Sequence, residues 1–205
     1  MSKSNLRRVH GITYLTPQHK IIKRLKRENP AEIHGTKHWG SGFLLMEYFK
    51  RNKPKKGCRV LELGAGWGLT SAYLAKHFKC KVTALDADEN VFPYLDAHAE
   101  LNEVEIKTLC KPFEKLSKKE LDKYDLIIGG DICFWDSLSD ILFKLIRKAN
   151  SGKTRKKIII ADPERPPFWD LVDRCIDKVD ADMEVIEQTT NKPRRLTGQL
   201  LVIET

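Results

Sequence analysis

The feature that most constrains this chain is a glycine-rich loop between two apolar stretches of different period. The loop, residues 62–68, reads ELGAGWG. It begins inside residues 59–63 (RVLEL), a short apolar run typical of a buried strand, and it leads into residues 69–78, whose apolar positions have helical spacing. Glycine lets a backbone turn tightly and lets a ligand approach it closely. This order of strand, glycine turn and helix predicts the first unit of a nucleotide-binding α/β fold.

An acidic residue follows the loop at the spacing expected for a residue that binds a ribose. Asp86 lies 22 residues beyond Gly64, directly after a second strand-like run at residues 81–85. A carboxylate there can accept hydrogen bonds from the ribose hydroxyls of a nucleoside ligand. A dinucleotide fingerprint would place its third glycine at position 69, which is leucine. Glu62 would repel a pyrophosphate but suits a cationic ligand, and S-adenosylmethionine carries an ammonium and a sulfonium. The residues therefore favour S-adenosylmethionine over a nicotinamide cofactor.

Beyond residue 57, strand-like and helix-like stretches alternate along the chain. The expected strands span residues 59–63, 81–85, 104–109, 124–129, 157–161, 183–190 and 196–204. The expected helices span residues 69–78, 89–101, 137–149 and 168–178, with a short extra helix started by a capping box of Ser117 and Glu120. We predict an α/β fold: a Rossmann-like, seven-stranded, mainly parallel sheet with helices on both faces and a C-terminal antiparallel hairpin.

The glycine loop, its preceding acid and Asp86 together resemble the class I, or seven-β-strand, S-adenosylmethionine-dependent methyltransferases. The resemblance implies an enzyme of class EC 2.1.1.- with S-adenosylmethionine as its cofactor. It implies a cofactor site formed by Trp39, Glu62, Gly64, Ala65, Gly66, Gly68, Asp86, Ala87 and Asp131. The chain departs from the family after the third strand, where residues 109–111 (LCK) lack the acid that often binds the adenine amine. The adenine contact is therefore left unassigned.

Two further stretches narrow the resemblance. Residues 131–134 (DICF) follow the fourth strand of the series, and residues 162–168 (DPERPPF) follow the fifth. They look like the Asp-x-x-Tyr and Asp-Pro-x-Arg-Pro-x-Phe segments of the protein-lysine methyltransferase branch that includes the electron-transfer flavoprotein β-subunit lysine methyltransferase. The resemblance implies that Asp131 and Phe134 serve catalysis at the methyl acceptor and that Trp39 acts as a lid. Phe134 replaces the family tyrosine, so the phenol hydroxyl is absent.

Simpler interpretations of these residues stay open. Asp131 could cap the helix that follows it, and Trp39, Phe134 and Trp135 could be ordinary core residues. The segment at 162–168 could be a plain turn, since Asp-Pro and Pro-Pro favour turns. The leading interpretation is that residues 162–168 line the same crevice as Asp131, because the carboxyl ends of parallel strands meet at one edge of a sheet.

The first 56 residues are expected to be an N-terminal helical cap, and residues 57–205 the methyltransferase domain. Residues 17–27 have the pattern of a basic amphipathic helix, and Ser41 is a candidate cap for a second helix. We expect these helices to cover the sheet and the mouth of the ligand site. The net charge is +9, and most of its excess lies in this segment. Solvated helix faces explain such a run without a nucleic-acid footprint, because no aromatic RNA-binding motif or zinc finger accompanies it.

The predicted function is protein-lysine N-methylation, with the lysine side chain of a protein as partner. The alternatives are a small-molecule amine methyltransferase, an RNA methyltransferase, and a non-catalytic module that binds S-adenosylmethionine. RNA is less favoured because the segment after the fourth strand lacks an Asn-Pro-Pro-Tyr-type motif. The oligomeric state and the identity of the acceptor are not predicted.

Several site classes and locations are excluded by composition. The five cysteines are widely spaced without a CxxC pair, which argues against a disulfide framework or a zinc site. His34 and His38 have metal-ligand spacing only on a helix, and Gly35 argues against one, so no metal is predicted. No apolar run approaches the ~20 residues that span a bilayer, and none follows the basic N-terminus. We therefore expect a cytoplasmic protein that does not enter a membrane.

Overall fold

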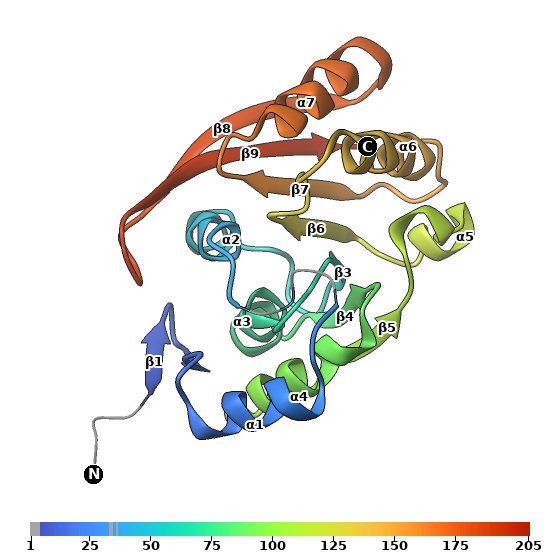
Figure 1. Cartoon of the computed structure of the whole chain (residues 1–205). Coiled ribbons are helices and arrows are strands. Elements are labelled where there is room, and N and C mark those ends of the chain that lie inside the picture. Colours follow the sequence, from blue (N-terminus) through green and yellow to red (C-terminus); the bar gives the residue numbers. More distant parts are fainter. Residues whose placement is uncertain (1–4, 33–34, 36) are drawn as a thin grey trace.

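The computed structural model describes residues 5–32, 35 and 37–205 and contains a seven-stranded sheet with helices on both faces (Figure 1). The strand order is β5-β4-β3-β6-β7-β9-β8. The strands are β3 (Arg59–Leu63), β4 (Lys81–Asp86), β5 (Lys107–Cys110), β6 (Leu126–Gly130), β7 (Lys157–Asp162), β8 (Asp182–Thr190) and β9 (Leu196–Glu204). Strands β3 to β7 pair in parallel, whereas β9 is antiparallel to both β7 and β8. The predicted fold class is confirmed.

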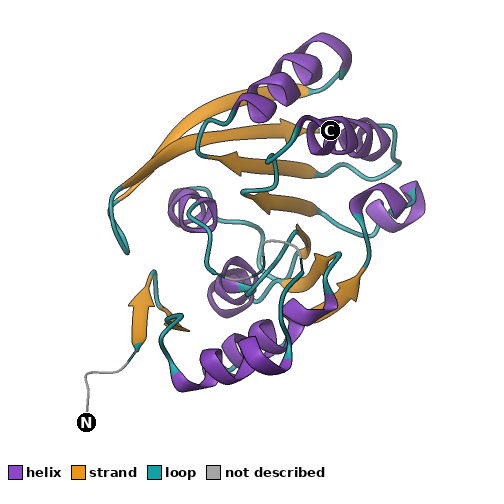
Figure 2. Cartoon of the chain, viewed as in Figure 1, coloured by secondary structure: helices purple, strands orange, loops and turns teal. Residues whose placement is uncertain are grey.

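The helices form one layer on each face of the sheet (Figure 2). One layer contains α2 (Ser41–Arg51), α3 (Leu69–Phe78) and α4 (Phe92–Leu101), and the other contains α5 (Lys118–Leu121), α6 (Asp136–Asn150) and α7 (Pro166–Lys178). Short 3₁₀ turns, η1 (Glu89–Val91) and η2 (Phe113–Lys115), precede α4 and α5. Because neighbouring residues of a strand face opposite layers, Ile159 of β7 packs with α2 and α3, and Ile160 packs with α6 and α7.

The sheet grows in two directions from its centre. β4 and β5 extend it on one side of β3, and the chain then crosses to place β6 on the other side. The helices that follow β3 and β6 lie on opposite faces, so the chain diverges at the C-terminal ends of these two strands and opens a crevice there. Leu63 and Gly129 are partners in the β3–β6 register. The glycine loop after β3 and the segment after β6 therefore meet at this crevice.

The segment before residue 57 contains a hairpin that the sequence analysis did not predict. β1 (Leu6–Val9) pairs antiparallel with β2 (Ile12–Leu15), and the turn between them is made by His10 and Gly11, both at positive φ. Gly11 accepts this conformation without strain, which favours a tight turn over a helix. The expectation of helices alone is therefore wrong for this part. The expected basic helix is present as α1 (Lys20–Glu28), and the domain division at residue 57 stays a prediction.

The N-terminal elements cover two different surfaces. α2 lies on the sheet, with Leu44, Leu45 and Met46 in the core, whereas α1 packs outside α4 through Ile22 and Leu25. No helix within the described residues is both long enough and apolar enough to cross a membrane.

Candidate functional site

A crevice of about 400 Å³ lies beyond the C-terminal ends of β3, β4, β5 and β6. Most of the predicted site residues line it: Trp39, Gly64, Gly66, Asp86, Ala87, Asp131 and Phe134. A recess of about 60 Å³ shares the Trp39 and glycine-loop walls and adds the others: Glu62, Ala65 and Gly68. The structure therefore brings all of the residues predicted for the cofactor and the acceptor to one place.

The three loop glycines all have positive φ, but they are required for different structural reasons. A Cβ atom on Gly64 would lie 2.7 Å from the Ile132 side chain, and one on Gly68 would lie 2.5 Å from Leu95. These two glycines permit close packing of the loop against its own protein. A Cβ atom on Gly66 would meet nothing within 4 Å. Gly66 therefore presents bare backbone to the crevice, where a ligand can approach it.

Asp86 is fixed at the edge of the crevice by backbone hydrogen bonds. Its Oδ2 accepts the Gly66 N–H at 2.9 Å, and its Oδ1 accepts the Asp88 N–H at 3.1 Å. Burial raises the pKa of this carboxyl. A carboxylate has about four acceptor positions, so the group keeps capacity to accept a hydrogen bond from a ligand hydroxyl. The ribose role of Asp86 stays a prediction.

Glu62 is almost fully buried under the loop, with 5% of its surface exposed. Its Oε2 accepts the Ser71 N–H at 3.0 Å and also the Ser71 hydroxyl, so the carboxylate is held at the start of α3. Burial raises its pKa to about 7. A cation placed in the adjoining recess would favour the ionised carboxylate, because opposite charge lowers a raised carboxyl pKa. The site therefore fits a ligand that carries positive charge.

Across the crevice, two buried carboxylates share one guanidinium. Arg165 Nη2 donates to Asp131 Oδ1 at 2.8 Å, and Arg165 Nη1 donates to Asp162 Oδ2 at 2.7 Å. The Asp162 side chain is fully buried, which raises its pKa to about 6. The expectation that residues 162–168 line the crevice is wrong: none of them is among its lining residues, and Asp162 lies behind the wall, because Arg165 folds back between it and Asp131. The structure nonetheless confirms that the ends of β6 and β7 bring these residues together.

Asp131 also supplies the N-terminal cap of α2. Its Oδ2 accepts the Ser41 N–H at 2.7 Å, across 90 residues of sequence. The prediction that Ser41 caps this helix is wrong. Gly40 already has helical φ and ψ, so Ser41 lies in the first turn, and its hydroxyl has no hydrogen-bond partner among the described residues. The alternative in which Asp131 caps the helix after it is not supported either, because α6 begins after Trp135 without a side-chain cap.

Aromatic side chains form the mouth of the crevice. The rings of Trp39 and Phe134 meet edge to face at 4.9 Å, and the Arg165 guanidinium carbon lies 4.2 Å from the centre of the Phe134 ring. Lys37 Nζ lies 4.2 Å from the centre of the Trp39 ring. Trp39 and Phe134 are half-buried, and Trp135 is 50% exposed. These rings are therefore not ordinary core, and they could wall a narrow apolar channel for an acceptor.

Sequence reasoning missed several residues of the crevice wall. They are Pro112, Phe113 and Glu114 after β5, and Ile132, Leu138 and Ile141 beside Asp131. Those after β5 stand where the family acid was absent, and the end of the third parallel strand was the available signal for them. The others are apolar residues at helical or turn positions, and their types alone do not distinguish a crevice wall from core.

Two imidazoles hold the backbone at the end of β2. The Leu15 N–H donates to His98 Nε2 at 3.1 Å, and the Leu15 carbonyl accepts from His38 Nε2 at 2.9 Å. Burial lowers the pKa of His98 to about 4 and that of His38 to about 3, so both are neutral near pH 7. His38 therefore bonds to the backbone, and His34, which the sequence analysis weighed with it as a metal pair and rejected, lies outside the described residues. The described residues contain no cluster of three metal-ligating side chains.

Comparison with known proteins places this geometry among methyltransferases. A family model described as "Lysine methyltransferase" matches residues 20–171. The chain is 29% identical over 136 residues to the human electron transfer flavoprotein beta subunit lysine methyltransferase, an alignment covering 64% of this chain and 49% of that protein. It is 24% identical over 130 residues to the calmodulin-lysine N-methyltransferase of Arabidopsis thaliana, covering 59% and 43% respectively. The chain thus spans about half the length of these curated relatives.

Solved structures agree on the fold. The M. jannaschii TYW2 structure in complex with AdoMet superposes with a TM-score of 0.61 and 16% identity, covering 100% of this chain and 88% of that one. At this identity the likeness establishes the shared Rossmann-like architecture and leaves the acceptor open.

Proposed function

The chain belongs to the lysine methyltransferase family, and we propose that it transfers methyl groups from S-adenosylmethionine to the side-chain amine of a lysine in a protein substrate. The observation that supports this most is the joining of two halves in one crevice. Gly66 and Asp86 offer a nucleoside subsite, and the Trp39 and Phe134 rings border an apolar mouth beside it.

The residues of the cofactor half fit S-adenosylmethionine. Bound there, this cofactor would supply a methyl group already activated by its sulfonium. Asp86 would accept hydrogen bonds from the ribose hydroxyls, and the bare backbone of Gly66 would allow close contact. Glu62 would be drawn to the ionised state by the cofactor's positive charge, since burial holds its pKa near 7 without it.

The acceptor half must orient an amine and keep it free of its proton. Methyl transfer needs the lone pair of the amine nitrogen. Catalysis therefore depends mainly on holding the amine close to the methyl group and on a channel without water, which disfavours the charged ammonium. Phe134 and Trp39 would exclude water on two sides. Asp131 keeps a free lone-pair direction on each oxygen beyond its bonds to Ser41 and Arg165, and with it would align the amine.

The first test is transfer of labelled methyl from S-adenosylmethionine into a cell extract, with parallel protease and nuclease treatments. We expect a discrete, protease-sensitive product that yields methyl-lysine on mass spectrometry. Label confined to a nuclease-sensitive or small-molecule fraction would replace the proposal with an RNA or small-molecule acceptor. No label in any fraction, together with measurable cofactor binding, would favour a non-catalytic binding module.

The role of Asp131 is tested with Asp131→Asn, which keeps an oxygen for the Ser41 N–H. Loss of the charge should reduce turnover by about 10²-fold, the lower end of what one positioned catalytic group contributes. Affinity for S-adenosylmethionine, measured by calorimetry, should change by less than about threefold, the range of a contact outside the binding site. Equal losses in turnover and affinity would remove Asp131 from the acceptor site.

A further inference from the structure

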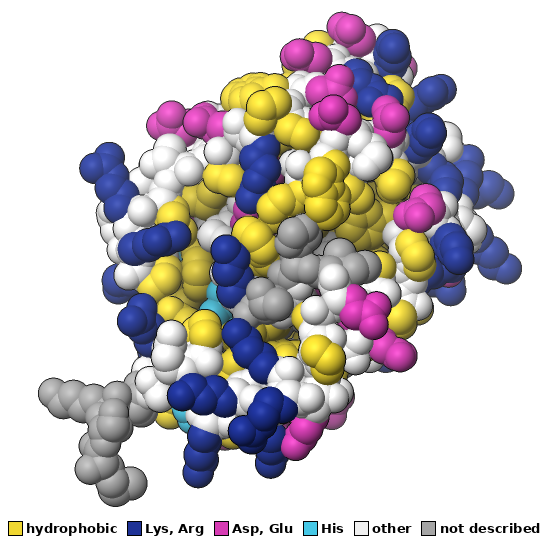
Figure 3. Space-filling model, viewed as in Figure 1, with side chains coloured by type: hydrophobic (Ala, Val, Ile, Leu, Met, Phe, Trp, Pro, Cys, Tyr) yellow, Lys and Arg dark blue, Asp and Glu magenta, His cyan; other side chains and the backbone are white. Residues whose placement is uncertain are grey.

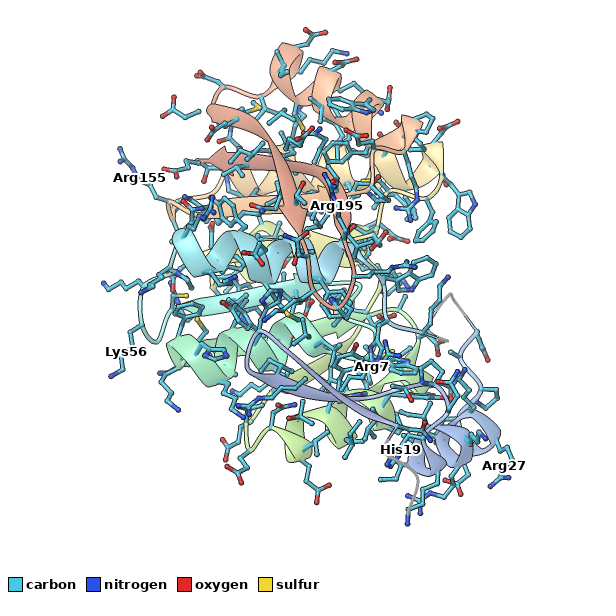
Figure 4. All side chains as sticks on the ribbon, turned by 90° about the vertical axis from the view of Figure 1, so that its left-hand side faces the viewer. Arg7, His19, Arg27, Lys56, Arg155 and Arg195 are labelled. Carbon is cyan, nitrogen blue, oxygen red and sulfur yellow. The ribbon has the colours of Figure 1, made fainter. Side chains whose placement is uncertain are left out.

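One feature of the chain is not used by the proposed chemistry: a band of exposed basic side chains along the N-terminal elements and the β8–β9 tip. We name this the basic band. It consists of Arg7, Arg8, Lys20, Lys23, Arg24, Lys26, Arg27, Lys37, Lys192, Arg194 and Arg195, all of them exposed. Figure 4 shows Arg195, Arg7 and Arg27 following one another from the hairpin tip down to α1, with His19 between the last two.

The elements of the basic band are joined to one another. Asn5 Nδ2 donates to the Gln18 carbonyl at 3.1 Å, and the Thr16 N–H donates to the Asn5 carbonyl at 2.7 Å, so the start of β1 is tied to the start of α1. At the other end, Thr190 Oγ1 and His10 Nε2 lie 3.4 Å apart, which joins the end of β8 to the β1–β2 turn. These contacts join three segments of the band, β1, α1 and the β8–β9 tip, into one surface.

The same elements are attached to the wall of the crevice. Ile22 and Leu25 on the inner side of α1 pack with Trp67, which belongs to the glycine loop. The Leu196 side chain lies against Gly40, one residue after Trp39. Lys37 itself sits over the Trp39 ring at the mouth. A molecule bound along the basic band would therefore be held next to the acceptor opening.

Folding does not account for this charge. Among the described residues, the only ion pair that a lysine or arginine of the basic band makes joins Arg24 to Glu28, at 3.7 Å and on the surface. Five cations on the nine residues of α1 repel one another, which opposes the helix. On the far side of the crevice, α7 exposes the acids Asp170, Asp173 and Asp177. Figure 3 shows dark blue side chains to the left and below the centre and magenta ones gathered at the top, with further dark blue side chains along the right edge.

We propose that the basic band binds an acidic segment of the protein substrate, next to the lysine that enters the crevice. This inference rests on the proposed function and names its substrate class. Charge complementarity selects a polyanion, and the absence of exposed rings from the described part of the band selects a polypeptide over single-stranded RNA. Of the rings beside the band, Tyr14 and Tyr94 are buried and Trp39, under Lys37, is half-buried, while the exposed Trp135 lies across the crevice.

The test uses synthetic peptides with one central lysine and flanks rich in glutamate, in serine, or in arginine. Each peptide is assayed for methyl transfer with the full chain, and a fluorescent copy of each is used for binding by anisotropy. We expect the glutamate-flanked peptide to have the lowest KM and the highest affinity, with both advantages lost in high salt. Equal KM values for the three peptides would overturn the inference while leaving the proposed function intact.

A charge reversal then locates the effect. The double variant Lys23→Glu/Arg27→Glu should raise KM for the glutamate-flanked peptide at least about tenfold, as loss of several surface charge contacts implies. Its kcat and S-adenosylmethionine affinity should stay within about twofold of the parent, because neither residue reaches the crevice. The matched control is Lys153→Glu/Arg155→Glu, which changes the net charge equally at the opposite end of the sheet, where Figure 4 places Arg155.

Three outcomes would contradict the inference: an equal KM rise in the control, no KM rise in the band variant, or tighter binding of a single-stranded RNA carrying the same number of charges. If no peptide is methylated, the proposed function fails, yet anisotropy still decides the inference. Band-dependent binding of the glutamate-flanked peptide would then support it, and binding that ignores the reversal would reject it.

Discussion

The two sides of the crevice are held in place by contacts of very different range. On the side of β3 and β4, Asp86 binds the N–H of Gly66, 20 residues away, and Glu62 binds Ser71, 9 residues away. On the side of β6 and β7, Asp131 binds Ser41 across 90 residues and Arg165 across 34. The first side is therefore built within one strand–turn–helix unit and its neighbour, whereas the second exists only once three distant segments have met.

The difference extends to the electrostatics. The acids of the first side, Asp86 and Glu62, accept hydrogen bonds from neutral N–H and hydroxyl donors, so a positive charge beside them would have to come from a ligand. The acids of the second side are already paired with a guanidinium that no ligand needs to supply. Loss of an acid on the first side should therefore weaken binding, and loss of the shared guanidinium on the second should weaken the fold.

The largest effect should come from Arg165→Leu, which leaves the Asp131 and Asp162 carboxylates buried without their shared counter-charge. Removing one partner of a buried ion pair typically costs about 3–5 kcal/mol, and we expect a loss near 3 kcal/mol in urea unfolding. The control Arg174→Leu breaks pairs with exposed Asp140 and Asp170 and should cost about 1 kcal/mol or less. Similar losses in both variants would contradict the contrast between the two sides.

Asp86→Ala should come next, and it should act on binding. Two hydrogen bonds from hydroxyls to a carboxylate contribute about 1.5–3 kcal/mol each, so S-adenosylmethionine affinity should fall by about 10²-fold or more in calorimetry. Asp96→Ala removes an exposed acid of α4 and should leave the affinity unchanged. Unchanged affinity in Asp86→Ala would refute the ribose role.

Lowering the pH should change the stability of the crevice carboxyls and of the N-terminal hairpin in opposite directions. The pKa of His98 is lower in the fold than its ordinary value of 6.5, so the stability it gives is present above pH 6.5 and is lost as the pH falls toward about 4. Glu62 and Asp162 act in the opposite direction, because their pKa values are raised to about 7 and about 6 and the fold takes up their protons first.

Between pH 7 and pH 5, hydrogen exchange at the Leu15 amide should therefore speed up more than exchange at the Ser71 amide, after correction for intrinsic rates. The expected loss of local stability is on the order of 1–2 kcal/mol, since one pKa unit corresponds to about 1.4 kcal/mol. In His98→Asn this extra acid sensitivity should shrink. Its persistence would mean that the imidazole does not hold the hairpin through its protonation state.

The smallest effect should follow Phe134→Tyr, which restores the hydroxyl that the resembling enzymes carry. The ring still meets Trp39 and Arg165, and one added hydrogen bond is worth about 1 kcal/mol, so turnover should change by no more than about fivefold. A change of 10²-fold in methyl-transfer assays would show that the hydroxyl, and not the aromatic wall, controls this side of the crevice.

The amino-acid sequence by itself determined the fold class, the order of strands and helices beyond residue 57, the glycine loop and the place of Asp86. These features depend on short-range patterns: apolar period, glycine at positive φ, and an acid at the end of the next strand. It also indicated that the segments after β6 and β7 belong together, since parallel strands end at the same edge.

Only the tertiary structure decided what Asp131 binds, that Asp162 lies behind the crevice, and that β1 and β2 form a hairpin held by His38 and His98. The physical reason is that a carboxylate takes whichever donors the finished packing brings near it. Asp131 could have capped its own helix, but α2 arrives on the sheet with an uncapped N-terminus, and Arg165 arrives from the next strand end. The contacts of Asp131 with α2 and Arg165 depend on how whole elements pack, so no local sequence pattern predicts them.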